Sequence, residues 1–127
     1  MKNEDVGANA EGFLKFLKDA SAELYAAKAD VDYCERKTQD ILHELEIMDM
    51  SYHERAHLSG DLADIRKQRR DAKDMIDLLT PVVEWAGNAN LVIGKLQTCL
   101  GTIRKTEEKQ KNRVYWKRAD GQGEFIR

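Results

Sequence analysis

Residues 10–48 read AEGFLKFLKDASAELYAAKADVDYCERKTQDILHELEIM, and apolar or small side chains recur in this segment with a period of seven. Two interleaved series keep this spacing: Ala10, Leu17, Leu24, Val31, Thr38 and Leu45, and Phe13, Ala20, Ala27, Cys34, Ile41 and Met48. A 3.5-residue repeat sustained over more than five heptads is typical of a coiled-coil seam. The segment therefore predicts one long helix that packs along its length on another helix.

A second helix is expected directly after the first. Ser51-Tyr-His-Glu54 has the S-x-x-E pattern of a capping box, which places a helix start there and the end of the first helix near Asp49. So short a connection forces the two helices to run antiparallel. The second helix again shows a heptad seam, with one basic residue in a core position: Leu58, Leu62, Ile65, Arg69, Ala72, Ile76, Leu79, Val83 and Ala86.

The sequence after residue 80 predicts a break, a third helix and a tail. Pro81 favours a kink or a restart with Thr80 as N-cap, and Gly87-Asn-Ala-Asn90 favours a stop followed by a second N-cap. The third helix carries an apolar side made of Leu91, Val92, Leu96, Cys99, Leu100 and Ile103. Two short β-prone runs follow Lys109, so the tail is expected to be extended or a β-hairpin. We predict an all-α oligomeric bundle over residues 1–108 and a basic, aromatic extension over 109–127.

Charge is distributed unevenly along the chain. Of 127 residues 44 are charged and the net charge is −2, but residues 1–103 carry a net −6 and residues 104–127 a net +4. The uneven distribution argues against a positive electrostatic potential over the whole protein that would attract nucleic acid. The basic tail is the one segment that could attract it locally. No apolar run approaches the roughly 18–20 residues that span a bilayer, and the N-terminus is polar. We expect a cytoplasmic protein without a membrane partner, with Cys34 and Cys99 as buried free thiols.

His53-Glu54-Arg-Ala-His57 matches the H-E-x-x-H pattern of zinc proteases, in which two histidines on one helix face hold the metal. A third ligand is missing at the position where the longer protease pattern has one, because Ala63 stands there. The capping box already explains Glu54, and two amphipathic helices hardly form the walled cleft that a catalytic zinc needs. The match is therefore interpreted as incidental. Without a nucleophile triad or a glycine-rich phosphate loop, we expect no enzyme and no cofactor.

Arg66 and Arg69 have no acidic residue three or four positions away, unlike Lys67, Arg70 and Lys73 of the same basic run. Those other charges form three i,i+4 pairs: Lys67 with Asp71, Arg70 with Asp74, and Lys73 with Asp77. A guanidinium at the seam position of Arg69 needs an anionic partner. The candidates are an acidic side chain of the first helix (Glu35, Asp40 or Glu44) and an external anion, of which the structural ion pair is favoured.

The tail alternates cations with aromatic rings, in the set Arg104, Lys105, Lys109, Lys111, Arg113, Tyr115, Trp116, Lys117 and Arg118. Such side chains stack on bases and pair with phosphates. The same side chains could bind a protein or a small anionic ligand. Alternatively, the tail could fold back onto the bundle and pack along its edge. Because no nucleic-acid-binding motif is present, a protein or small anionic ligand is favoured over nucleic acid.

Four stretches together resemble small helical proteins encoded by bacteriophages and prophages of Gram-positive bacteria: Asp40-Ile-Leu-His-Glu-Leu-Glu46, residues 62–74, Leu79-Thr-Pro81 and Lys111-Asn-Arg-Val-Tyr115. The resemblance implies an accessory protein acting inside the host cell. Some small oligomers of this kind block a defence effector or sequester a nucleotide signal. The resemblance carries no active-site residues with it.

These observations give one leading hypothesis and two alternatives. The first is a non-enzymatic homo-oligomer that inhibits or sequesters a host protein or an anionic nucleotide-type signal. Its ligand-binding residues would be Arg66, Arg69, Arg113, Tyr115, Trp116, Lys117 and Arg118. The alternatives are a nucleic-acid-binding accessory protein that uses the tail, and a structural coiled-coil scaffold.

Overall fold

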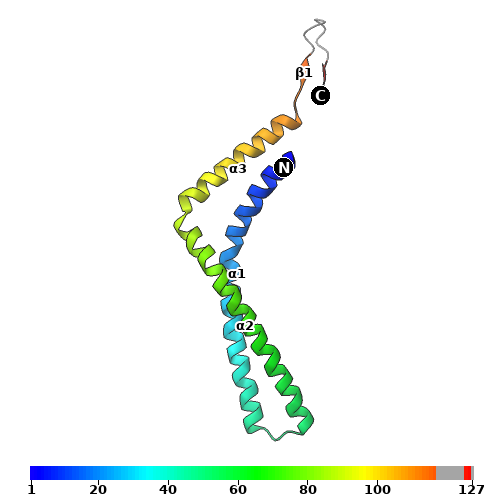
Figure 1. Cartoon of the computed structure of the whole chain (residues 1–127), viewed down its shortest axis with the longest axis vertical. Coiled ribbons are helices and arrows are strands. Elements are labelled where there is room, and N and C mark those ends of the chain that lie inside the picture. Colours follow the sequence, from blue (N-terminus) through cyan, green and yellow to red (C-terminus); the bar gives the residue numbers. More distant parts are fainter. Residues whose placement is uncertain (117–124, 127) are drawn as a thin grey trace. The chain divides into compact units, whose positions relative to one another are not determined.

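The computed structural model describes residues 1–116 and 125–126, and three helices account for most of this part (Figure 1). They are α1 (Asn3–Ile47), α2 (Tyr52–Asn88) and α3 (Asn90–Lys111). Two short strands, β1 (Tyr115–Trp116) and β2 (Phe125–Ile126), pair antiparallel with Tyr115 opposite Ile126. The predicted all-α class is thus confirmed. Within the described residues, no helix has the length and apolar character needed to cross a membrane.

The helix boundaries follow local hydrogen bonding. α1 begins seven residues earlier than predicted, and its first turn carries Glu4 and Asp5, whose negative charge favours a helix N-terminus. It ends at Ile47, as expected. The predicted cap of α2 is confirmed, because the amide of Glu54 donates to Ser51 Oγ at 3.2 Å.

The chain divides into two compact units. The hairpin unit is Phe16–Asn88, and the terminal unit combines Met1–Lys15 with the chain from Ala89 onward. The first turns of α1 thus belong to the terminal unit and its remaining turns to the hairpin unit. The boundary predicted after residue 108 lies within α3.

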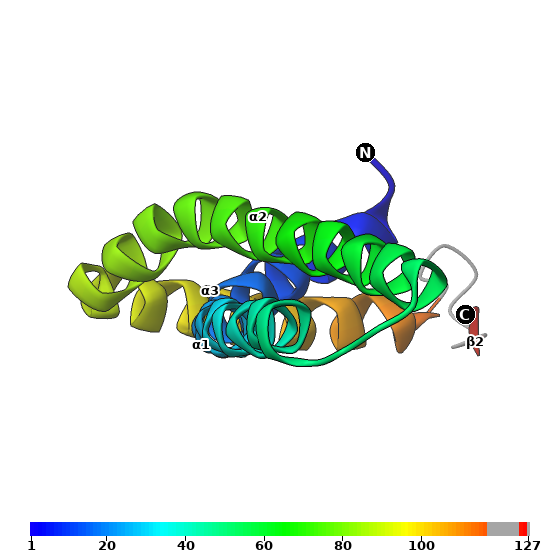
Figure 2. The ribbon, with the colours of Figure 1, turned by 90° about the horizontal axis from the view of Figure 1, so that it is seen from below.

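In the hairpin unit α1 and α2 run antiparallel and are joined by residues 48–51 (Figures 1 and 2). The buried residues form two clusters that both helices share. One cluster consists of Ala20, Leu24 and Leu79, with Ile76, Val82 and Val83 packed against it. The other consists of Cys34, Ile41 and Ile65, with Leu45, Leu58 and Leu62 packed against it. Every one of these residues except Val82 belongs to a predicted seam, so the heptad pattern did identify the core.

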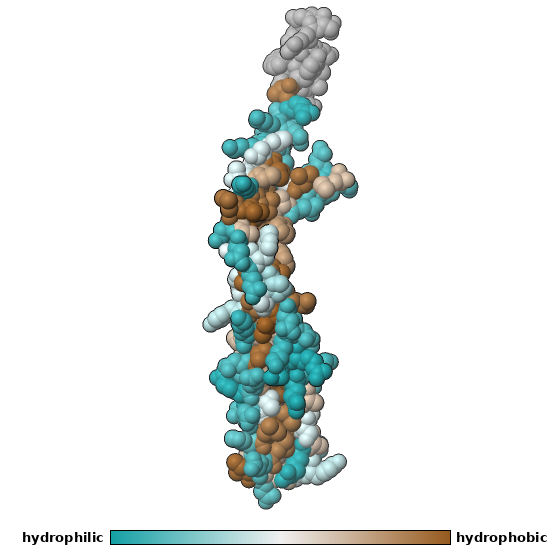
Figure 3. All heavy atoms as spheres, turned by 60° about the vertical axis from the view of Figure 1, so that its left-hand side comes forward, coloured by the Kyte–Doolittle hydropathy of each residue, from teal (hydrophilic) through white to brown (hydrophobic). Residues whose placement is uncertain are grey.

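The predicted seam of α1 is longer than the buried one. The ends of its second series, Phe13 and Met48, are 46% and 56% exposed, whereas Ala10 and Leu45, the ends of the first, are half-buried. Between the two core clusters the buried positions are the small residues Ala27 and Ala72. The hairpin core is therefore narrow at its centre. Apolar side chains also reach the surface of the chain between charged ones (Figure 3).

The helix restart predicted at Pro81 is wrong, because α2 continues through this residue to Asn88. A proline inside a helix costs about 3 kcal/mol, since it removes a hydrogen bond and crowds the preceding turn. Seam residues on both sides of it offset this cost, because Leu79 is buried and Val83 packs against the same cluster. The Thr80 hydroxyl, expected to cap a new helix, donates instead to the carbonyl of Ile76 at 2.6 Å.

The asparagine cap predicted for the third helix is also wrong. Ala89 alone separates α2 from α3 and occupies the cap position without a side-chain hydrogen bond, whereas Asn90 is already helical. Ala89 is buried, and its carbonyl accepts from the amide of Ile93 at 2.9 Å. The start of α3 is therefore determined by burial of the small Ala89 side chain and not by a polar cap.

In the terminal unit, α3 packs on the first turns of α1 around Arg104. This guanidinium bonds Glu11 of α1 and lies 3.3 Å from Glu107 of its own helix. Gly7 of α1 is buried beneath these groups, and a side chain there would meet the ends of Arg104 and Glu107. α3 contains no buried residue, so polar contacts contribute much of this packing.

Candidate functional site

A groove on one side of the hairpin brings the two predicted arginines together. It is lined by Asp32, Glu35, Arg36, Thr38 and Gln39 of α1 and by Arg66 and Arg69 of α2. The heptad pattern explains why they meet. Glu35 follows the core residue Cys34 and Arg66 follows the core residue Ile65, so both flank the same side of the seam.

Arg69 forms the predicted ion pair with the first helix, and its partner is Glu35. Nε and Nη2 of Arg69 donate to Glu35 Oε1 at 3.3 and 3.1 Å. The Arg69 side chain is 36% exposed and that of Glu35 53%, so water screens the pair. Asp40 and Glu44, the other two candidates, do not bond it. Arg69 thereby has a structural partner, which leaves it less available to an external anion.

Arg66 differs from the other two arginines of the groove. Arg36 pairs with Asp32 at 3.2 Å and Arg69 pairs with Glu35. Among the described residues, no carboxylate or other acceptor bonds Arg66, which is exposed at the groove wall. One guanidinium with all its donors free therefore stands beside two neutralised pairs.

The i,i+4 pairs predicted along α2 are not formed. Within the described residues, Lys67–Asp71, Arg70–Asp74 and Lys73–Asp77 do not lie within ion-pair distance, and all six side chains are exposed. Exposed pairs of this type gain only a few tenths of a kcal/mol, so solvation competes with them. The cation-rich stretch of α2 is thus a solvated surface except at Arg69.

The Cys34 thiol lies in the core behind this groove. It is fully buried, as predicted, and burial raises the pKa of this thiol, assisted by the Asp30 carboxylate and opposed by Arg69. It is therefore a protonated packing group at neutral pH. The prediction for Cys99 is wrong, because this free cysteine is exposed on α3. Within the predicted apolar side of α3, Leu96, Leu100 and Ile103 are half-buried, whereas Leu91, Val92 and Cys99 are exposed, so only part of that side is used for packing.

The His53-Glu54-His57 motif lies at the exposed start of α2. Both histidines line a groove with Glu44, Met48, Asp49, Met50 and Leu58. His57 Nε2 is 3.7 Å from Asp61 on the next turn. The part of the chain that the structure describes holds no group of three or more metal-ligating side chains. Glu54 contributes its amide to the Ser51 cap, which agrees with the interpretation of the motif as a helix start.

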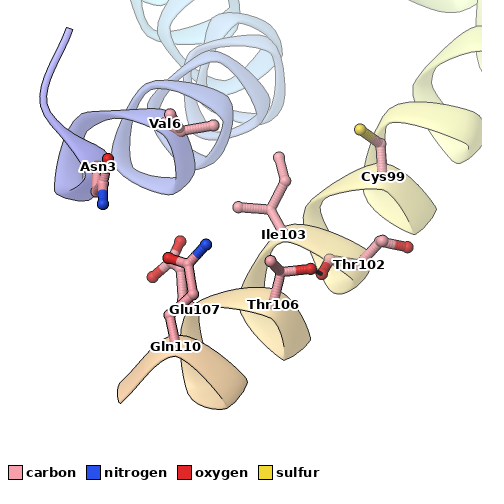
Figure 4. A pocket seen from close by; sticks show the side chains of 8 residues that line it. All are labelled: Asn3, Val6, Cys99, Thr102, Ile103, Thr106, Glu107 and Gln110. Carbon is pink, nitrogen blue, oxygen red and sulfur yellow. Dashed lines mark hydrogen bonds between the residues drawn. The ribbon is translucent and has the colours of Figure 1, made fainter. Parts of the chain in front are cut away.

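The terminal unit has a pocket of its own between the first turns of α1 and α3. Val6 and Ile103 point into it, and Glu107 and Gln110 extend toward Asn3 (Figure 4). Cys99, Thr102 and Thr106 complete its lining from α3. Three of its eight lining residues, Val6, Cys99 and Ile103, are apolar, and the cations singled out in the sequence do not line it.

The remaining predicted ligand residues lie in the tail. Arg113 is exposed just after α3, and Tyr115 and Trp116 form β1. Lys117 and Arg118 lie outside the described residues. The tail and the groove belong to different units.

Sequence reasoning missed the α1 side of the groove apart from Glu35. The Asp32–Arg36 pair was readable as an i,i+4 pair of opposite charges. Thr38 and Gln39 carry no such signal, since only the register of the two helices places them opposite Arg66. A comparison with protein-family models, with curated proteins and with solved structures found no match.

Proposed function

We propose that this chain is a non-enzymatic binding protein that holds an anionic group of its partner at Arg66. The observation that carries the proposal is the free guanidinium beside two neutralised arginines in the hairpin groove. An arginine fork binds phosphate or carboxylate through paired charge-assisted hydrogen bonds. The resemblance to phage-encoded helical proteins favours a host component as the partner, either a defence effector or a nucleotide-type signal.

The groove suits capture better than catalysis. Its polar groups are largely committed to ion pairs, and the buried Cys34 thiol behind it has a raised pKa and so is no nucleophile. Asp32 and Glu35 neutralise Arg36 and Arg69 and fix their positions, so Arg66 carries the net positive charge of the groove. Such an arrangement binds an anion and rejects a cation without needing a reacting group.

A titration of the full chain tests the proposal. Pyrophosphate and a short polyglutamate peptide serve as probes of the two anion classes, followed through the Nε–Hε NMR signals of arginine. We expect the Arg66 signal to shift, and Arg66→Ala to weaken binding at least tenfold. Arg70→Ala is the matched control, because Arg70 is exposed on the same helix but does not line the groove. Equal binding by wild type and Arg66→Ala would refute the proposal.

A second candidate function is nucleic-acid binding by the tail. The specific observation is that Lys109, Lys111 and Arg113 are all exposed at the end of α3. For single strands, log K falls with log salt with a slope of about −0.7 per neutralised phosphate. Anisotropy of a labelled single-stranded oligonucleotide between 50 and 200 mM salt measures this slope. A flat response, or no binding at low salt, excludes this function.

We further infer that the chain is a homo-oligomer with coiled-coil-type packing. Ten hydrophobic residues of the described part are buried, and only five of them are leucine or isoleucine. Such a core is small against the conformational entropy of a chain of this length. Association with a second copy adds the burial that a thin hairpin lacks. Light scattering coupled to size exclusion measures the mass directly.

A further inference from the structure

The hairpin has a second groove, on the side of the seam opposite to Arg66. Its lining includes Asp30 and Tyr33 of α1 and Asp71 and Met75 of α2. These residues precede seam positions by one, whereas Glu35 and Arg66 of the other groove follow seam positions by one. The two grooves therefore flank the seam on opposite sides.

Seven-residue steps extend this groove into a longer surface. On α1 the steps add Asp19 and Glu23, which precede the buried Ala20 and Leu24. On α2 they add Leu78 and Trp85, which are 68% and 48% exposed. We call the surface formed by these eight residues the acidic face.

The acidic face combines exposed apolar side chains with one sign of charge. Tyr33, Met75, Leu78 and Trp85 supply the apolar part, and four carboxylates border them. Two copies of this face would repel each other, because its eight residues carry four negative charges, and the seven-residue step from Asp30 to Lys37 adds a single cation beside them. A symmetric contact of the face with itself is therefore disfavoured, and its occupant must be basic and amphipathic.

The same chain carries a surface of that kind on α3. Leu91, Val92 and Lys95 occupy its first turns, and Lys105 and Lys109 follow toward its end; all five are exposed. The helix thus presents apolar residues near its start and cations along its length. We call the surface formed by these five residues the basic face of α3.

We propose that the acidic face of the hairpin binds the basic face of α3 from a second copy of this chain. Charge complementarity selects the partner, and the apolar residues of both faces supply the burial. When the contact forms in both directions between two copies, they close into a dimer with no acidic face left open. The inference rests on the proposed self-association and assigns its surfaces.

Two charge-reversed variants of the full chain test the assignment. In one, Asp19→Lys, Glu23→Lys and Asp71→Lys reverse the acidic face. In the other, Lys95→Glu, Lys105→Glu and Lys109→Glu reverse the basic face. All six side chains are exposed, and none of them forms an ion pair within the described residues. Asp30 is left in place because its carboxylate accepts from Gln68 at 2.7 Å across the hairpin.

We expect wild type to be dimeric at low salt and to dissociate as salt screens the contact. Each variant alone should be monomeric, because its two faces then carry the same charge. An equimolar mixture should form a one-to-one heterodimer, since the acidic face of one variant then meets the basic face of the other in both contacts. Circular dichroism confirms that each variant keeps its helices. The control with Glu46→Lys, Asp74→Lys and Asp77→Lys changes as many charges elsewhere and should stay dimeric.

Three results would overturn the inference, and they differ in what they say of self-association. If both variants remain oligomeric, the chain self-associates through other surfaces. If wild type is monomeric at every salt concentration, self-association is wrong as well. Loss of association in the variants without recovery in the mixture would also contradict a contact between two copies.

Discussion

The guanidinium of Arg69 donates two hydrogen bonds to one carboxylate oxygen of Glu35, from Nε at 3.3 Å and from Nη2 at 3.1 Å. On α2, Arg69 lies between Ile65 of the second cluster and Ala72, where the seam is narrow, and on α1 Glu35 directly follows Cys34 of the second cluster. Gln68 donates to Asp30 at 2.7 Å on the other side of the seam. Polar contacts therefore fix the register of α1 against α2 where apolar packing is weakest.

We expect the Arg69–Glu35 pair to contribute a coupling energy below about 1 kcal/mol, because both side chains are partly exposed and solvent screens them. A double-mutant cycle with Arg69→Ala and Glu35→Ala, followed by urea unfolding, measures it. The exchanged pair Arg69→Glu with Glu35→Arg should recover most of the loss caused by Arg69→Glu alone. A coupling energy near zero would mean that the pair does not help to hold the register.

The second cluster should dominate the stability of the hairpin. Ile41→Ala is expected to lower the free energy of unfolding by about 2–5 kcal/mol, since Ile41 is 2% exposed and its removal leaves a cavity. Leu42→Ala is the matched control, because Leu42 is the next residue of the same helix but is largely exposed. Chemical denaturation of both variants should show a much smaller change for the control. Equal losses would contradict the packing of α1 on α2 described above.

The cap of α2 gives a local prediction. Ser51→Ala should destabilise the chain by about 0.5–2 kcal/mol, because the amide of Glu54 loses its acceptor. Ser59→Ala, within the same helix and exposed, should be neutral or slightly stabilising, since alanine has the higher helix propensity. Thermal unfolding monitored at 222 nm distinguishes the two. A stable Ser51→Ala variant would mean that water replaces the cap.

The two cysteines should differ in reactivity. Cys99 is exposed and should react with a thiol reagent in the native protein, whereas Cys34 should react only after unfolding. Burial excludes the reagent from Cys34, and its raised pKa keeps the thiol protonated. Counting labels by intact-mass spectrometry gives one label in the native state and two in denaturant. Two labels in the native state would show that the hairpin core opens.

Cys34 should also make stability depend on pH. Its pKa is raised in the folded state, so its contribution is fully present below the pKa of the unfolded thiol, ordinarily about 8.5. That contribution is lost as pH rises from there through the folded pKa. Urea unfolding of wild type and of Cys34→Ala between pH 7 and 10 measures this contribution as the difference between the two free energies of unfolding. All other titrating groups are present in both proteins, so their effects cancel in the difference. A difference between the two proteins that stays constant over this range would contradict the prediction.

The sequence by itself determined the helical class, the hairpin connection and most core residues. Heptad spacing identified Leu24, Cys34, Ile41 and Ile65 as buried, because a helix places residues of that spacing on one face. Ser51 identified the start of α2 because a cap depends only on neighbouring residues. Helix periodicity and capping depend only on residues that are close in the sequence, so they can be predicted without the tertiary structure.

Only the tertiary structure decided how these helices use their remaining side chains. Three acidic residues of α1 could have paired with Arg69, and the register of the hairpin selected Glu35. Pro81 remained helical because seam residues on either side of it pack on α1. Cys99 is exposed because α3 packs through only part of its predicted apolar side, where Leu96, Leu100 and Ile103 are half-buried. Arg66 likewise has no bonded acceptor among the described residues because the register of α1 places none within reach. The spacing of residues within α2 cannot predict this.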